Sequence, residues 1–226
     1  TLDMASADDI RSYVAANDID YAYDYGSSTD WQKEVLRTGI SHNHNLSING
    51  GSKKTTYMAS LNYNNREGVI KGTNMYRINF RSLVSSKVLK DHLDLSAGLN
   101  AMYGKHEGVP MNNEGGSVLD AMNYFNPTLP IKNEDGSWSR GDGSGNYNPL
   151  SLIAEDSSEF EWKRMQFIGK ATAYIVKGLT WNANYQYSNK QRTYSSYDSH
   201  NTQLNGISDF NGRANRSNYQ GHDQTF

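Results

Sequence analysis

Apolar and polar residues alternate along much of the chain, and the pattern begins between Ser41 and Gly72. A tight turn is expected at Asn49–Ser52, and apolar residues then occupy every second position from Tyr57 to Tyr63. The residues between them are small or mostly polar, so a strand here has two faces of opposite character. This alternation is typical of a transmembrane β-barrel strand, which meets lipid on one side and water on the other.

The same period of two predicts a series of antiparallel strands in sequential up-and-down order. We expect them at about 43–49, 54–64, 74–86, 92–104, 163–176 and 179–190. The segment from Leu93 to Gly104 alternates without a fault, which no buried helix would do. Residues in the apolar phase are expected on one convex, lipid-facing side: Tyr57, Leu61, Ile78, Leu95, Leu99, Phe167, Ala171, Trp181 and Tyr185.

Polar side chains in the opposite phase are expected to line a wet lumen. The lumen-facing candidates are Arg77, Asn79, Arg81, Asn100, Asn182 and Asn184.

The connections between the expected strands alternate in length. The first, third and fifth are short, the second is moderate, and the fourth is a long loop over about 105–162. Outer-membrane barrels place short turns on the periplasmic side and long loops outside the cell. A β-sandwich has no reason to collect its long connections at one end, so the lengths favour a barrel.

Short helices are expected outside the strands. Ser6 is placed to cap a helix that continues to Ala16. Thr29 and Gln32 have the spacing of a capping box before a second helix, which Gly39 is placed to end. In the long loop one helix is expected between Gly115 and Phe125, whereas residues 211–226 show no pattern that assigns them.

Composition fits a chain whose strands have one wet face. Only 36% of the 226 residues are hydrophobic, although 16 tyrosines are included, and the mean hydropathy is -0.79. Cysteine is absent and no run of about 18 apolar residues exists, so neither a disulfide framework nor a transmembrane helix is expected. A net charge of -2 argues against a nucleic-acid partner. Because the chain starts on Thr1 without a signal peptide, we expect it to be a piece of a longer protein.

Residue patterns that resemble chemical sites are incomplete. His42 and His44 would share a strand face, but no third metal ligand is near them in sequence. Asp135 and Asp142 lie in glycine-rich turns that lack the ligand spacing of a calcium loop. The segment Gly141–Gly145 lacks the Lys and Ser or Thr that end a phosphate-binding loop. No metal site and no cofactor are therefore expected.

Four carboxylates could supply the acid pair of a glycoside hydrolase, but they are expected to lie in a solvated loop between elements. They are Glu155, Asp156, Glu159 and Glu161. No catalytic residue is assigned, and the chain is not expected to be an enzyme. Recognition is the remaining chemistry, because flat amphipathic rings in or beside the outer loops can stack on sugars or peptides. The candidate ligand contacts are Trp138, Tyr147, Tyr194 and Tyr197, each of which also suits loop packing or membrane anchoring.

Several segments resemble the SusC-like TonB-dependent transporters of the Bacteroidetes outer membrane (the RagA/SusC family). They are the TDWQ sequence at residues 29–32, NHNLSINGG with TTYMASLNYNNREGVIKG at 43–72, LKDHLDL at 89–95, and the loop from NPTLP at 126–130 to NPL at 148–150. Together they cover roughly residues 29–187.

This resemblance implies an all-β fold, in which antiparallel up-and-down strands form part of a large transmembrane β-barrel. Residues 1–39 would be a link before the barrel strands, and residues 40–226 would be a partial barrel with one long extracellular loop. The family imports oligosaccharides or peptides with a SusD-like surface lipoprotein, and is driven by the TonB complex through N-terminal regions that this chain lacks. The outer membrane would be its location and membrane lipid its surrounding. The alternative from the residues alone is a soluble β-sandwich that binds glycans, and neither interpretation identifies the substrate.

Overall fold

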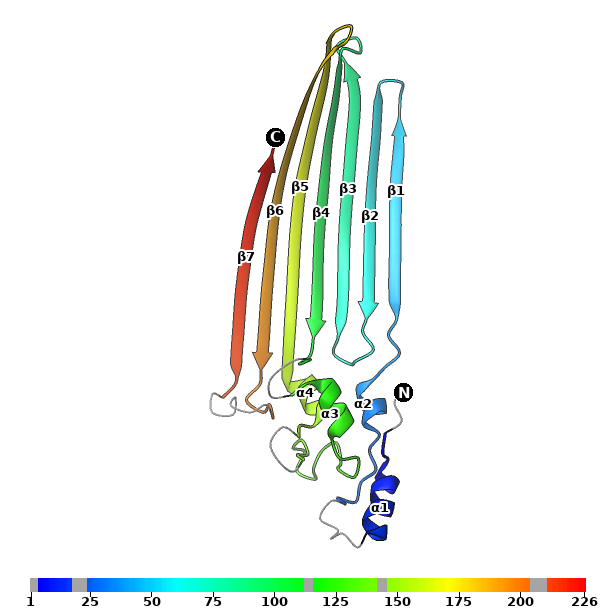
Figure 1. Cartoon of the computed structure of the whole chain (residues 1–226), viewed down its shortest axis with the longest axis vertical. Helices are drawn as coiled ribbons and strands as arrows, with labels where there is room; N and C mark the ends of the chain where they lie inside the picture. Colours follow the sequence, from blue (N-terminus) through cyan, green and yellow to red (C-terminus); the bar gives the residue numbers. More distant parts are fainter. Residues whose placement is uncertain (1–3, 18–23, 112–115, 142–145, 204–210) are drawn as a thin grey trace.

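A single antiparallel sheet dominates the computed structural model, which describes residues 4–17, 24–111, 116–141, 146–203 and 211–226. Its strands are hydrogen-bonded in sequence order, each to the next (Figure 1). The strands are β1 (Ser41–Gly51), β2 (Thr55–Glu67), β3 (Asn74–Val88), β4 (Leu93–Gly108), β5 (Asp156–Val176), β6 (Leu179–Asp198) and β7 (Arg213–Thr225). The helices are α1 (Ala7–Ala16), α2 (Trp31–Val35), α3 (Val118–Tyr124) and α4 (Pro149–Glu155). The predicted up-and-down order is confirmed.

Cross-strand pairing divides the side chains of the sheet between two faces. Leu61 lies opposite Phe80, whereas its neighbour Asn62 lies opposite Asn79. Since directly paired residues point to the same side of a sheet, the register can be followed from strand to strand. We call the side that carries Leu61 the apolar face and the side that carries Asn62 the polar face. Every residue predicted to share the lipid-facing side lies on the apolar face.

The short β1–β2, β3–β4 and β5–β6 turns all lie at one end of the sheet, and the longer connections lie at the other (Figure 1). The first turn differs from the prediction, because Asn49–Gly51 belong to β1 and the chain reverses at Ser52–Lys54. Ser52 explains the shift, since its hydroxyl oxygen accepts from the backbone N–H groups of Lys54 and Thr55.

Strands β5 and β6 extend furthest beyond their predicted ranges, and one strand was missed. Strand β5 begins at Asp156, so Glu159 and Glu161 lie in a strand and not in a solvated loop. Strand β6 continues to Asp198. Strand β7 was not predicted, because its sequence RANRSNYQGHDQT is polar in both phases and gives no alternation.

The helices differ from the sequence prediction mainly at their ends. Ser6 caps α1 in a reciprocal capping box with Asp9, which confirms the first helix. Asp30, not Thr29, caps α2, which ends at Val35 well before Gly39. The hydroxyl of Thr29 instead donates to the carbonyl oxygen of Leu129 in the long loop. Helix α3 lies within the range expected for it, whereas α4 was not predicted.

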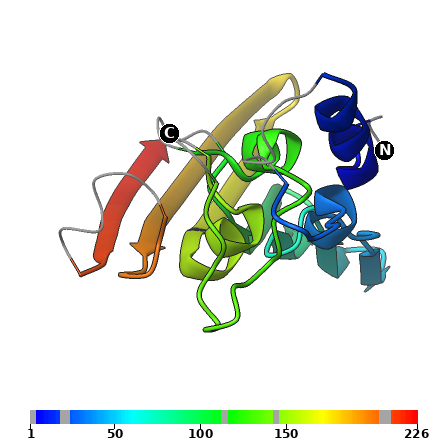
Figure 2. The same ribbon diagram turned by 90° about the horizontal axis from the view of Figure 1, so that it is seen from below.

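The buried core lies at the long-connection end and not on the sheet. Trp31 and Val35 from α2 pack there with Phe125 after α3 and Leu152 from α4. Figure 2, viewed from this end, shows the helices grouped across the end of the sheet. By contrast, large side chains of the apolar face are exposed: Leu46, Ile48, Tyr57, Leu61, Tyr63, Ile78, Phe80, Val84, Leu95, Phe167 and Trp181.

Candidate functional site

The polar face brings together all the residues predicted to face a lumen. Register places Arg77, Asn79, Arg81, Asn100, Asn182 and Asn184 on that one side. Three of them join neighbouring strands. Asn79 donates to Asn62 at 3.4 Å, Asn100 donates to Gln166 at 3.3 Å, and Asn182 accepts from the hydroxyl of Thr172 at 2.8 Å. The sequence therefore predicted the members of a shared surface, while its assignment to a lumen stays a prediction.

The indole of Trp162, which lies over Gly104 on the polar face, forms an aromatic platform that was not predicted. The row that crosses the sheet here passes through Arg77, Gly104, Trp162, Arg192 and Tyr219. A Cβ atom at Gly104 would clash with ring atoms of Trp162, so the absent side chain makes room for the indole. A glycine in an otherwise regular strand is the sequence signal for this close approach.

The aromatic residues predicted from the long loop are packed within it. Trp138 donates from Nε1 to Glu155 Oε1 at 3.0 Å, and Lys132 Nζ lies 4.4 Å from the centre of its ring. Tyr147 is 4% exposed and belongs to the buried core. As a result, Tyr147 offers almost no surface to a ligand.

Tyr194 and Tyr197 were expected in or beside an outer loop, but both lie within β6. They point to opposite sides of the sheet. Tyr194 pairs with Phe160 on the polar face, and Tyr197 pairs with Ser157 on the apolar face. The structure therefore does not bring the predicted aromatic contacts into one site.

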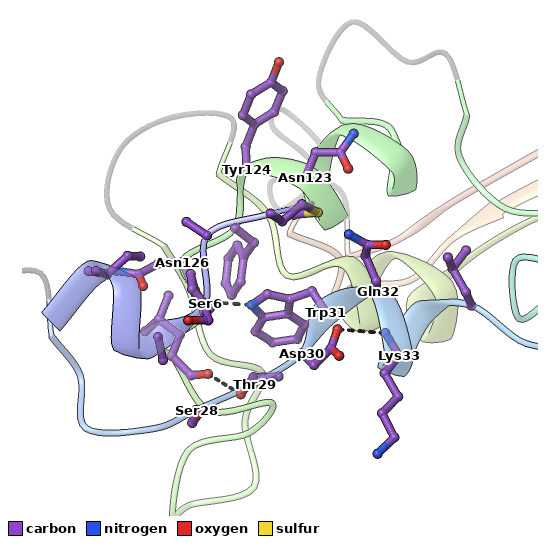
Figure 3. A pocket seen from close by; sticks show the side chains of 18 of the residues that line it. Ser6, Ser28, Thr29, Asp30, Trp31, Gln32, Lys33, Asn123, Tyr124 and Asn126 are labelled. Carbon is purple, nitrogen blue, oxygen red and sulfur yellow. Dashed lines mark hydrogen bonds between the residues drawn. The ribbon is translucent and has the colours of Figure 1, made fainter. Parts of the chain in front are cut away.

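A pocket of about 1160 Å³ opens between the N-terminal segment and the long loop (Figure 3). Trp31 lies at its centre, packs edge to face on Phe125 with ring centroids 5.0 Å apart, and donates from Nε1 to the carbonyl oxygen of Asn126 at 3.1 Å. Tyr124 points away from the indole and is 80% exposed. The pocket combines aromatic surface with amide and hydroxyl groups, and no sequence pattern indicated it.

Hydrogen bonds fix the N-terminal segment against the long loop over this pocket. The backbone N–H of Ser27 donates to the carbonyl oxygen of Thr128, and that of Thr29 donates to Pro127. Residues separated by about 100 positions in the chain therefore form one wall, so the N-terminal segment belongs to the same end of the sheet as the long loop.

Asp156 and Asp198 lie directly opposite each other where β5 and β6 meet the loops. Asp198 is paired with Arg213 at 3.1 Å. Asp156 accepts from the hydroxyl of Thr202 at 2.8 Å, and its other carboxylate oxygen is buried and has no hydrogen-bond partner among the residues that the structure describes. Burial raises the pKa of Asp156 to about 7, and the negative charges of Asp198 and Glu155 act in the same direction.

The weaker site candidates behave as ordinary surface or turn residues. The rings of His42 and His44 stack with centroids 6.2 Å apart on the exposed end of β1. Asp135 accepts from the backbone N–H of Ser137, as a turn residue does. Asp142 and most of Gly141–Gly145 lie outside the described residues. Within the described ranges, no three His, Cys, Asp or Glu side chains are grouped so that they could hold a metal ion.

Among the residues whose structure is described, no helix is both long and apolar enough to cross a membrane. No family model matches the chain.

Individual relatives show what the chain is similar to. It is 29% identical over 200 residues to TonB-dependent receptor P3 of Formosa agariphila, a match that covers 84% of this chain and 19% of the relative. It is 32% identical over 138 residues to TonB-dependent receptor SusC of Bacteroides thetaiotaomicron, covering 59% of this chain and 13% of the relative. The resemblance to SusC-like TonB-dependent receptors is confirmed. The chain spans less than a quarter of the length of these relatives.

A solved structure shows the same fold. The RagAB peptide transporter superposes with a TM-score of 0.70 and 19% sequence identity, over 91% of this chain and 23% of that one. The expected fold class, up-and-down strands that form part of a large transmembrane β-barrel, is therefore confirmed. The relatives are receptors and transporters, in agreement with the expectation that the SusC-like chain is not an enzyme.

Proposed function

We propose that this chain forms part of the barrel wall of an outer-membrane TonB-dependent transporter for nutrients. The apolar face meets lipid, and the polar face lines the lumen. The observation that carries the proposal is the uncovered row of large apolar side chains on one face, opposite a face of arginine, asparagine and serine. In water such a face would be an interaction or aggregation surface, whereas lipid covers it without cost.

The apolar positions also run obliquely across the sheet, which supports a membrane setting. One row of the apolar face passes through Tyr63, Ile78, Tyr103, Lys163 and Gln191. It is apolar at β2 and β3 and polar at β5 and β6. Because barrel strands are tilted by about 35–45° to the membrane normal, a band of constant membrane depth must cross such rows in this way.

The longer connections, with the N-terminal segment and its pocket, would lie outside the cell, and the short turns would face the periplasm. In this arrangement residues 1–39 approach the barrel strands from the outer side, and residues 40–226 make the wall and its long extracellular loop. We further propose that the complete receptor imports oligosaccharides or peptides with a SusD-like surface lipoprotein and the TonB complex. The relatives named TonB-dependent receptors support the TonB dependence, and the similarity to the RagAB peptide transporter supports peptides as one substrate class.

Cysteine labelling of the complete receptor in cells tests the orientation, and this chain contributes no cysteine of its own. Leu61→Cys and Asn62→Cys are adjacent but lie on opposite faces of β2. We expect a lipid-soluble maleimide to label position 61 and a water-soluble maleimide to label only position 62. The reverse pattern would show that the faces are exchanged.

A second pair tests the two ends. Glu134→Cys in the long loop should react with an impermeant maleimide on intact cells, whereas Lys53→Cys in the first short turn should react only after the outer membrane is opened. Equal labelling of all four positions would favour the soluble glycan-binding alternative. A single sheet with one bare apolar face gives that alternative no structural support.

A further inference from the structure

Basic residues are concentrated on the polar face. Register places these basic side chains on it: Arg66, Arg77, Arg81, Lys87, Arg164, Lys170, Lys190, Arg192 and Arg213. The acidic side chains on the same face are Asp94, Asp156, Asp198 and Asp223. The face therefore has a clear excess of positive charge, although the whole chain has a net charge of -2.

The acidic residues neutralise only part of this charge. Asp223 is bound by Lys190 at 2.6 Å, and Asp198 is bound by Arg213. Arg77, Arg81 and Arg192 are exposed and make no ion pair within the described part of the chain. These guanidinium groups are available to a bound anion.

The apolar face has no comparable excess. At its loop end Lys105 is held between Glu107 at 2.9 Å and Glu159 at 2.7 Å. Lys163 lies on the same strand face as Glu161 and Glu159. Since positive and negative groups are balanced there, the basic character belongs to the side proposed to line the lumen.

The basic residues surround the aromatic platform. Trp162 lies directly beside Arg192, and Arg77 lies on its other side beyond Gly104. With strands about 4.8 Å apart, Arg77 is about 10 Å from the Trp162 backbone, within reach of one ligand that spans the row. A flat ring offers an apolar stacking surface, and a guanidinium binds carboxylate or sulfate with paired hydrogen bonds.

We propose that the polar face selects anionic oligosaccharides, whose sugar rings pack on Trp162 and whose carboxylate or sulfate groups bind Arg77 and Arg192. The proposal rests on the transport function above and gives it a substrate class. Asn79, between Arg77 and Arg81 along β3, and Asn100, opposite Arg81, offer amide groups that suit sugar hydroxyl groups, which favours an acidic glycan over an acidic peptide. A wall with an excess of positive charge also raises the local concentration of anions in the lumen.

Binding to the purified complete receptor in detergent tests this selection. The probes are an oligogalacturonate, a neutral galacto-oligosaccharide of the same length and an oligoglutamate peptide, measured by calorimetry at low and high salt. We expect the acidic sugar to bind at least tenfold more tightly than the other two, with an affinity that falls as salt rises. Equal affinity for the neutral sugar, or a preference for the peptide, would overturn the proposal.

Matched variants separate a specific site from general charge. Arg192→Gln and Arg77→Gln should each weaken oligogalacturonate binding about tenfold, whereas Lys163→Gln, on the other face, should leave it unchanged. Gly104→Ala keeps every charge but removes the space under the Trp162 indole. It should weaken the sugar without changing the salt dependence.

An unchanged affinity in both arginine variants would mean that these residues pair with another part of the receptor, and would overturn the proposal. Cysteine labelling keeps the two proposals distinguishable. Water-accessible Asn62→Cys without anion preference would reject the substrate class and leave the transport function intact, whereas inaccessible Asn62→Cys would reject both.

Discussion

Both faces of this sheet carry exposed side chains, but the faces differ in the solvent that each requires. On the apolar face Leu61 and Trp181 are 45% and 55% exposed, and no helix covers them. On the polar face Arg77 and Arg192 are exposed as well. Exposure alone therefore does not make a surface hydrophilic. The alternation along each strand places a residue on the lipid side or on the water side. The buried core lies in the loops and helices at the end of the sheet.

The largest expected effect is the aggregation of the chain when it is separated from the neighbouring strands of its barrel and from lipid. Expressed without the rest of its barrel, the chain leaves β1 and β7 as unpaired edges and the apolar face uncovered. We expect it to aggregate or to depend on detergent in sedimentation and light-scattering experiments. A sharp monomer of about 25 kDa with a cooperative melt in plain buffer would contradict the assignment of the apolar face to lipid.

An arginine placed on one face or the other tests whether the two faces meet different solvents. Leu99→Arg puts a guanidinium on the apolar face near the middle of β4, and its matched control Asn100→Arg puts it on the polar face. In the complete receptor, refolded into lipid vesicles, the first change should lower the free energy of unfolding by about 2–4 kcal/mol. The second should change it by less than about 1 kcal/mol. Equal costs would show that both positions meet the same solvent.

The sheet could be predicted from sequence because its period of two is a local property. Leu93 to Gly104 shows each strand residue's face directly, so the shared apolar side follows from the alternation alone. Strand β7 has no such signal, since a strand that is polar in both phases has the same pattern as a loop. Its pairing with β6 depends on backbone hydrogen bonds, which the side-chain pattern does not record.

The candidate site was harder to predict because it depends on long-range packing. Tyr147 looked like an exposed loop ring, but its burial depends on helices that approach from distant parts of the chain. The platform at Trp162 needs Gly104 on a neighbouring strand, and their pairing requires the correct register across a long loop. The residue types suggested that aromatic rings bind a ligand, whereas the positions of those rings in space could be known only from the fold.

The pH dependence of stability at Asp156 tests whether the carboxyl group is buried at the loop end of the polar face. Its raised folded pKa, about 7, means that its ionised form is disfavoured, so stability falls as the pH rises from about 4 to 7. Asp156→Asn should therefore stabilise this end by about 1–3 kcal/mol at pH 8, and the gain should disappear near pH 4.

Hydrogen exchange of the Ser199 amide, which donates to the carbonyl oxygen of Glu155, measures this local stability. A gain that is independent of pH would show that the carboxyl group of Asp156 is hydrated rather than buried.

The smallest expected effect concerns a carboxylate at the same end of β5 on the opposite face. Glu159 binds Lys105 at 2.7 Å, but the two side chains are 40% and 21% exposed and Lys105 keeps Glu107 as a second partner. Glu159→Gln should therefore lower the free energy of unfolding of the complete receptor by less than about 1 kcal/mol, and by still less in high salt, because exposed ion pairs are screened. The measurement is made at pH 8 in vesicles, beside Asp156→Asn. A loss of about 3 kcal/mol or more would mean that this ion pair lies in lipid, and the water boundary on the apolar face would then have to move beyond Glu159 toward the long loop.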